Sequence, residues 1–202
     1  MNKSNLVKNI SDQIIEAQLK LGYVKESIRL YYPIESLNAL LETNYSSVEE
    51  LVQVLNSMFE KKNIILCEDG RLKTDTVPQY ATEERLKGFC GVSFNSHAGR
   101  IEVNVSADGA EYIHKYVKTP EFLKDIIELF TVNHSLKLDE IKKLYSKYSS
   151  DYECEEMPQG SDFDYVLFFN DKTIDEYYYC IKIEMGHTIY HRFTEADYKM
   201  LI

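Results

Sequence analysis

The sequence is poor in the residues that interrupt regular structure, and it has no long apolar stretch. Among its 202 residues are four prolines, eight glycines and no tryptophan, and no apolar run exceeds five residues. A membrane-spanning helix needs about 20 predominantly apolar residues, so no span is expected. The N-terminus also lacks the apolar stretch of a secretory signal peptide. The four cysteines form no close pair of the zinc-knuckle or redox type, which favours reduced thiols in a cytosolic protein.

Short motifs of common catalytic sites are also missing. The sequence contains no G-x-S-x-G, no Walker loop, no dinucleotide fingerprint and no H-E-x-x-H. His187 and His191 could share a zinc ion on a helix, but their surroundings predict a strand, where four residues span roughly 13 Å. We therefore expect no cofactor and no enzyme of a commonly recognised type.

What the chain has in excess is negative charge, with 33 Asp and Glu against 23 Lys and Arg. Residues 151–176 hold nine carboxylates and one lysine, a formal charge of −8 within a total of −10. Such a segment suits a divalent cation, a basic partner, or a sheet edge kept soluble by charge. It is a poor surface for nucleic acid, because phosphates are bound by Lys and Arg.

The first 78 residues predict a module of three helices followed by a hairpin. Apolar residues recur at helical spacing up to Leu19, and Gly22 ends the pattern. Ser47 and Glu50 form a capping-box pair before the third helix. The expected elements are helices over about 6–21, 34–41 and 48–59, a strand over 27–32, and a two-stranded wing over 64–74.

In the order of these elements, residues 5–76 resemble the winged-helix superfamily. The resemblance implies DNA binding, which makes a transcriptional regulator one alternative function. Its expected recognition helix, however, offers mainly acids and amides to solvent. These residues are Glu49, Glu50, Gln53, Asn56, Ser57 and Glu60. Since DNA-binding surfaces neutralise phosphates with Lys and Arg, we do not expect nucleic acid as a partner, and protein–protein contact is favoured.

Residues 79–202 predict a second domain, of α+β type. A hairpin around His97-Ala98-Gly99 precedes helices over about 108–117, 120–132 and 139–148. An antiparallel meander follows, with strands over 152–157, 165–169, 177–184 and 188–193, and a short helix closes the chain after Thr194. The predicted fold class is α+β: a winged-helix-like N-terminal module plus a C-terminal four-stranded antiparallel meander packed with helices on one face. The all-apolar strand over 165–169 is expected to be central.

Four carboxylates of the acidic segment are candidate site residues. Glu153 and Glu155 fall on one face of a strand, and Asp162 and Asp164 do so if the next strand includes them, because strand side chains alternate. Such pairs could converge on Mg²⁺ or Ca²⁺, which leaves a divalent-metal-dependent hydrolase as a second alternative. The same charges also suit an edge strand kept soluble or a basic protein partner.

A run of tyrosines gives the second candidate surface. Tyr177, Tyr178 and Tyr179 belong to a set of 16 tyrosines, a residue that favours strands and interfaces. They fit a partner-binding surface, which also makes a homodimer possible. They fit equally well a core that packs against the helix over 139–148.

These observations favour a non-catalytic interaction or regulatory module with an acidic, tyrosine-rich C-terminal sheet. Lysine far outnumbers arginine, and Asn, Ile and Tyr are abundant, which suits an AT-rich bacterial genome. We therefore expect a bacterial, cytosolic protein that meets a basic protein partner.

Overall fold

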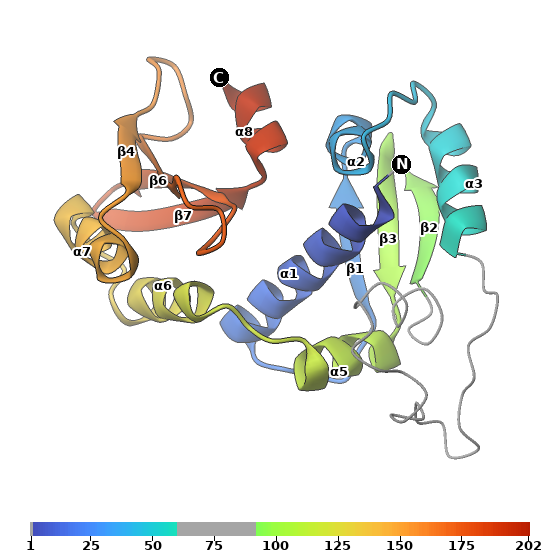
Figure 1. The fold of residues 1–202 in the computed structure, drawn as a ribbon, viewed down its shortest axis with the longest axis horizontal. Helices are drawn as coiled ribbons and strands as arrows, with labels where there is room; N and C mark the ends of the chain where they lie inside the picture. Colours follow the sequence, from blue (N-terminus) through green and yellow to red (C-terminus); the bar gives the residue numbers. More distant parts are fainter. Residues whose placement is uncertain (1, 60–91) are drawn as a thin grey trace. The chain divides into compact units, whose positions relative to one another are not determined.

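The computed structural model describes residues 2–59 and 92–202 (Figure 1). The chain divides into two compact units, Met1–Lys118 and Thr119–Ile202. The described elements of unit 1 are α1 (Lys3–Leu21), β1 (Ile28–Tyr32), α2 (Ile34–Leu41), α3 (Val48–Phe59), β2 (Val92–His97), β3 (Arg100–Val105) and α5 (Ala107–Tyr116). Those of unit 2 are α6 (Glu121–Val132), α7 (Leu138–Tyr148), β4 (Tyr152–Glu156), β5 (Tyr165–Phe169), β6 (Tyr178–Glu184), β7 (His187–Phe193) and α8 (Glu195–Leu201). Helices and antiparallel sheets occur together, so the predicted α+β class is confirmed.

The sheet of unit 1 is antiparallel, with the strand order β1-β3-β2. One face packs on the helices. The centres of the Phe94 ring of β2 and the Phe59 ring of α3 lie 5.1 Å apart. The Tyr32 hydroxyl of β1 donates to Asn9 Oδ1 of α1 at 2.8 Å. The alternation of apolar and polar residues along these strands thus places the core of unit 1 between its sheet and its helices.

This sheet changes the predicted division of the chain. The sequence assigned the hairpin of β2 and β3 to the second domain, whereas β3 pairs with β1 and belongs to unit 1. The predicted boundary between residues 78 and 79 lies outside the described residues. So does the predicted wing over 64–74. The winged-helix resemblance therefore stays a prediction.

Helix α3 covers the outer edge of β2. The Asn56 side chain donates from Nδ2 to the Phe94 carbonyl at 2.7 Å and accepts the Phe94 N–H at Oδ1 at 3.0 Å. The Ser96 hydroxyl donates to Glu49 at 3.4 Å. The sequence placed Asn56 and Glu49 on the solvent side of a recognition helix. Both residues are exposed, and both side chains also make hydrogen bonds with β2. The two bonds of Asn56 satisfy the N–H and C=O of Phe94, which an edge strand would leave open.

The sheet of unit 2 is an antiparallel meander in the order β4-β5-β6-β7, as predicted. Strand β5 lies between β4 and β6, and its residues Val166 and Leu167 are fully buried. The prediction of a central, all-apolar strand is therefore confirmed. Alternation along the strands gives the sheet two faces. We call the face that carries Leu167 and Tyr179 the α6–α7 face, and the face that carries Val166 and Tyr178 the α8 face.

Helices cover both faces of this sheet, although the sequence predicted helices on one face (Figure 1). On the α6–α7 face, the Phe122 ring of α6 contacts the rings of Phe169 at 4.8 Å and Tyr179 at 5.5 Å. On the other face, the Tyr198 ring of α8 stacks on the Tyr178 ring at 4.7 Å. The sequence predicted the closing helix after Thr194, but the face on which it packs depends on contacts with strands distant in the sequence, which a local pattern does not show.

Candidate functional site

Strand β4 is an outer strand of the four-stranded sheet, and its ladder partner is β5. The N–H of Met157, just past the end of β4, donates to the Asp164 carbonyl at 2.9 Å. Backbone groups alternate in direction along a strand of an antiparallel pair, so every second residue of β4 directs its N–H and C=O away from β5. These residues are Tyr152, Cys154 and Glu156. Within residues 2–59 and 92–202, these outward backbone groups have no hydrogen-bond partner.

Three exposed glutamates line this edge. Glu153 and Glu155 lie on the α8 face, because they pair with Phe168 and Val166, and Glu156 lies on the other face. Glu153 accepts a hydrogen bond from the Asn170 side chain at 3.2 Å. None of the three glutamates has a Lys or Arg nitrogen within 4.0 Å in the part of the chain that the structure describes.

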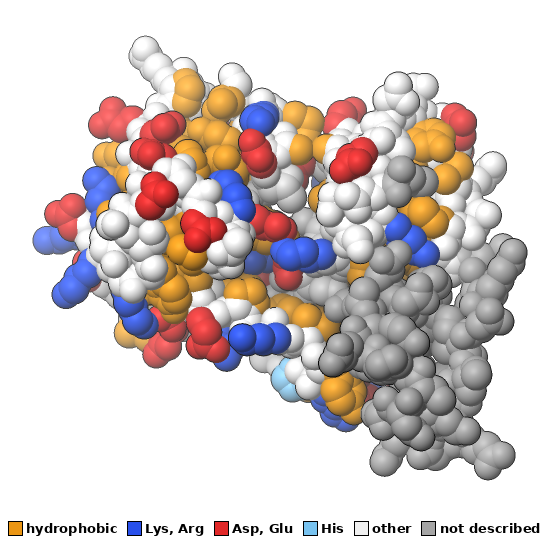
Figure 2. All heavy atoms as spheres, viewed as in Figure 1, with side chains coloured by type: hydrophobic (Ala, Val, Ile, Leu, Met, Phe, Trp, Pro, Cys, Tyr) orange, Lys and Arg blue, Asp and Glu red, His pale blue; other side chains and the backbone are white. Residues whose placement is uncertain are grey.

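Acids on the helices differ, because several have a lysine partner. Asp12 pairs with Lys8 at 3.0 Å, and Glu16 pairs with Lys20 at 2.7 Å. In unit 2, Glu195 pairs with Lys199 at 2.7 Å. In Figure 2, Asp and Glu side chains of unit 2 lie over the β4 end, while several Lys and Arg side chains, with acids among them, lie around α7.

The one lysine of the acidic segment is engaged elsewhere. The Lys172 ammonium lies 4.8 Å from the centre of the Phe168 ring and 4.4 Å from that of Tyr178, a cation–π arrangement. Burial lowers the pKa of Lys172 from its ordinary value, although neighbouring carboxylates such as Glu195 oppose this effect. Its charge therefore sits over aromatic rings instead of forming an ion pair with the glutamates of β4.

The strand that follows does not include the second candidate pair of carboxylates, so the condition under which they would share a strand face is not met. Asp162 is exposed, and both Asp162 and Asp164 precede β5 instead of lying on it. The Asp164 carboxylate accepts the backbone N–H of Ile183 at 2.6 Å, and the Asp164 N–H donates to the Ile181 carbonyl at 2.8 Å. Asp164 thus extends the pairing of β5 with β6, a structural role that residue spacing alone does not show.

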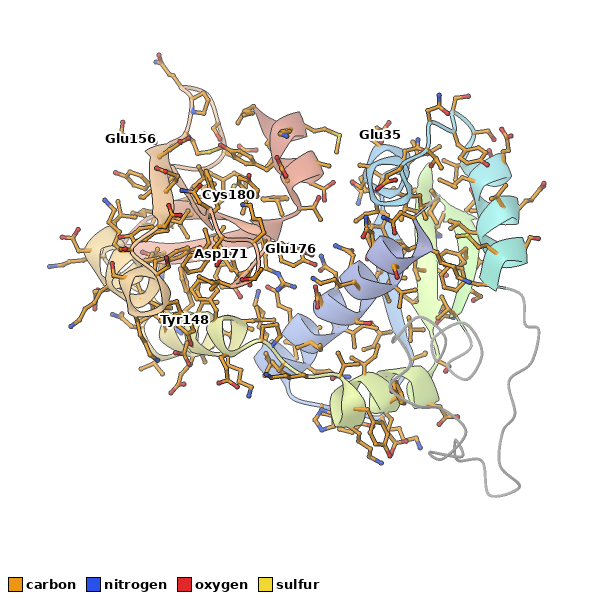
Figure 3. The ribbon with its side chains drawn as sticks, in the orientation of Figure 1. Glu35, Tyr148, Glu156, Asp171, Glu176 and Cys180 are labelled. Atoms are coloured by element: carbon orange, nitrogen blue, oxygen red, sulfur yellow. The ribbon has the colours of Figure 1, made fainter. Side chains whose placement is uncertain are left out.

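The acidic segment does not converge on one point. Across the described ranges, no group of three or more His, Cys, Asp or Glu side chains could hold a metal ion. Figure 3 shows Glu156 at the outer side of β4, well apart from Asp171 and Glu176. The structure therefore gives no support to the metal-dependent hydrolase.

Asp175 is one of the nine carboxylates of residues 151–176, but it is buried, with an exposed fraction of 7%. Its carboxylate accepts the Tyr177 N–H at 2.8 Å and the Tyr179 hydroxyl at 3.1 Å. An Asp that bonds the backbone two residues later is a common turn device. Asp175 therefore orders the start of β6 and is not part of an exposed acidic surface.

The three tyrosines are core residues. The exposed fractions of Tyr177, Tyr178 and Tyr179 are 3%, 7% and 0%, so they form no exposed aromatic surface. The Tyr179 ring contacts the Tyr145 ring of α7 at 6.3 Å, as the packing interpretation predicts. Burial raises the pKa of Tyr179 well above its ordinary value. We do not include these tyrosines in the candidate site.

Within the described residues, the chain is a two-unit α+β protein in which the β4 edge of unit 2 is open and acidic. A family model described as "Domain of unknown function, E. rectale Gene description (DUF3877)" matches residues 3–68 and 73–202, nearly the whole chain. The chain belongs to that family. A search of curated proteins gives no match, and neither does a search of solved structures. In the described residues, no helix is long and apolar enough to cross a membrane.

Proposed function

We propose that the protein is a non-catalytic binding module that receives a basic protein partner at the β4 edge of unit 2. The observation that carries the proposal is the absence of ion-pair partners for Glu153, Glu155 and Glu156 within the described residues, while several helical acids have lysine partners. The bacterial and cytosolic setting stays a prediction from composition.

Unpaired surface charges of one sign mainly affect how fast and how selectively a partner associates. It steers a partner of opposite charge toward its surface and disfavours partners of like charge. The same charges also discourage strands of other molecules from pairing with an open edge. These two effects are compatible, because both disfavour acidic strands and neither excludes a basic partner.

The proposal is tested by fluorescence anisotropy with a labelled oligolysine peptide and the full chain. We expect binding at low ionic strength that weakens as salt is added, because surface charges are screened within about 10 Å at 0.1 M salt. Replacing the three β4 glutamates (E153Q, E155Q and E156Q together) is expected to lower the affinity by about tenfold or more, which corresponds to about 1.4 kcal/mol.

The matched control removes three exposed acids from α6 and α7 instead. The control variant carries E121Q, E128Q and D139N, so its net charge changes as much as that of the β4 variant. A loss of affinity confined to the β4 variant supports the proposal. Equal losses in both variants, or no binding of the peptide at low salt, would contradict it.

The winged-helix resemblance does not lead to a second proposal. Asn56 of α3 is engaged with Phe94, and Glu49 and Glu50 remain exposed on the same helix. Like-charge repulsion would oppose the approach of phosphates to this helix. No observation on the described part of unit 1 favours nucleic acid as a partner.

A further inference from the structure

We infer that the partner adds a β-strand to β4, and that the added segment alternates basic and apolar residues. This inference rests on the proposed function and specifies its chemistry. The outward N–H and C=O groups of Tyr152, Cys154 and Glu156 form a row of three donors and three acceptors. Strand addition at an open sheet edge uses such a row for affinity and side-chain positions for selectivity.

The basic positions of the added strand follow from the register of β4. Glu153 and Glu155 lie on the α8 face, and a directly opposite residue of a neighbouring strand has its Cβ about 4.5–5.5 Å away. Side chains of the added strand on that face therefore lie beside the two glutamates. Lys or Arg at alternate positions gives each glutamate an opposite charge.

The apolar positions follow from the other face. There the added strand lies beside Tyr152, whose ring contacts the Tyr145 ring of α7 at 5.3 Å, and beside Cys154, which is half-buried. Burial raises the pKa of the Cys154 thiol, and the nearby Lys142 of α7 partly opposes this rise. Because Lys142 is a cation, a second cation beside Cys154 would be repelled, and the one acid of this face, Glu156, lies at the end of β4. An apolar side chain avoids that repulsion and covers Tyr152.

A second copy of this chain does not fit the same edge. Antiparallel pairing of β4 with another β4 places glutamates of one strand opposite or diagonal to glutamates of the other. Like charges directly opposite each other destabilise a strand pair. The charge of β4 therefore favours a different chain of opposite charge.

The test compares peptides of equal charge and composition on the full chain. One alternates (Lys-Val-Lys-Val-Lys-Val-Lys), and one is a block isomer (Lys-Lys-Lys-Lys-Val-Val-Val). Two further versions of the alternating peptide carry backbone N-methyl groups, either on the lysines or on the valines. Since N–H groups alternate in direction along a strand, only one of the two methylated versions blocks hydrogen bonds to β4.

The expected result is at least about tenfold tighter binding of the alternating peptide than of the block isomer, and a loss of about tenfold or more in one methylated version only. Hydrogen exchange at the outward amides of Tyr152, Cys154 and Glu156 is expected to slow in the complex. Equal binding of all four peptides would overturn strand addition but leave a basic partner in place. Binding of none would overturn the proposed function as well. Outward amides that are protected in the free chain and lose that protection on dilution would identify a second copy as the occupant, which also overturns the inference.

Discussion

The two outer strands of the four-stranded sheet are protected in different ways. At β7, the Thr188 N–H donates to the His134 carbonyl and the Thr188 hydroxyl donates to the Leu136 carbonyl, both at 2.7 Å. The loop between α6 and α7 therefore covers part of that edge. At β4, the described residues provide no such cover, and exposed glutamates occupy the strand.

The β7 edge is therefore protected by a covering loop, and the β4 edge by the charge of its glutamates. Where the loop covers β7, the edge is closed to an added strand, because the Thr188 N–H already has a partner. A charged edge is closed only to strands that are neutral or carry the same charge, and it stays open to basic ones. The same sheet thus has one edge that a loop partly covers and one edge that, in our proposal, selects a basic partner.

The largest difference between the β7 and β4 edges is expected in the rates of amide hydrogen exchange. The amide of Thr188 points away from its own sheet yet is hydrogen-bonded, whereas the outward amide of Cys154 has no partner in the described chain. We expect the Thr188 amide of the free protein to exchange on the order of 100-fold more slowly than that of Cys154. The check is residue-resolved exchange by NMR, with the ladder amide of Leu167 as a protected reference. Similar rates at Thr188 and Cys154 would remove the distinction between the two edges.

Stability should depend on the cover at β7. Thr188→Val keeps the branched shape but removes the hydroxyl, which leaves the Leu136 carbonyl without this donor. Because Thr188 is 3% exposed, the loss of a buried hydrogen bond is expected to lower the free energy of unfolding by about 1–3 kcal/mol. The measurement is the midpoint of urea unfolding.

Thr173 provides the control for this substitution. Its hydroxyl bonds to Asp171 at an exposed site, so Thr173→Val should change the free energy of unfolding by less than about 0.5 kcal/mol. Equal effects of the two substitutions would show that the α6–α7 loop does not stabilise the edge of β7.

Local residue patterns in the sequence predicted several helices and strands well. The expected bounds of α2 and β5 agree with the structure, and Gly22 and Thr194 flank helices as expected. Each of these signals depends on residues within one turn of a helix or one strand. Strand alternation also placed Glu153 and Glu155 on one face, and the structure agrees.

Contacts between distant residues were not predictable in this way. The sequence contains no local signal that β1 pairs with β3 about 70 residues later, or that Thr188 bonds to a carbonyl 52 residues away. The burial of two residues could not be predicted for the same reason. Asp175 and Tyr178 have residue types common on surfaces and interfaces, and only the packing of the unit shows that both are covered.

The smallest effect on stability is expected at the charged edge. The combined variant E153Q, E155Q and E156Q removes no ion pair that the described residues form, and substitutions at such exposed sites usually stay within about 0.5 kcal/mol each. Its urea midpoint should therefore lie close to that of the unchanged protein and above that of Thr188→Val. Light scattering at high protein concentration should nevertheless increase, because the open backbone of β4 loses the charge that keeps other strands away. A variant that unfolds as easily as Thr188→Val, with unchanged scattering, would mean that the glutamates stabilise the fold, and the two edges of the sheet would then not differ in kind.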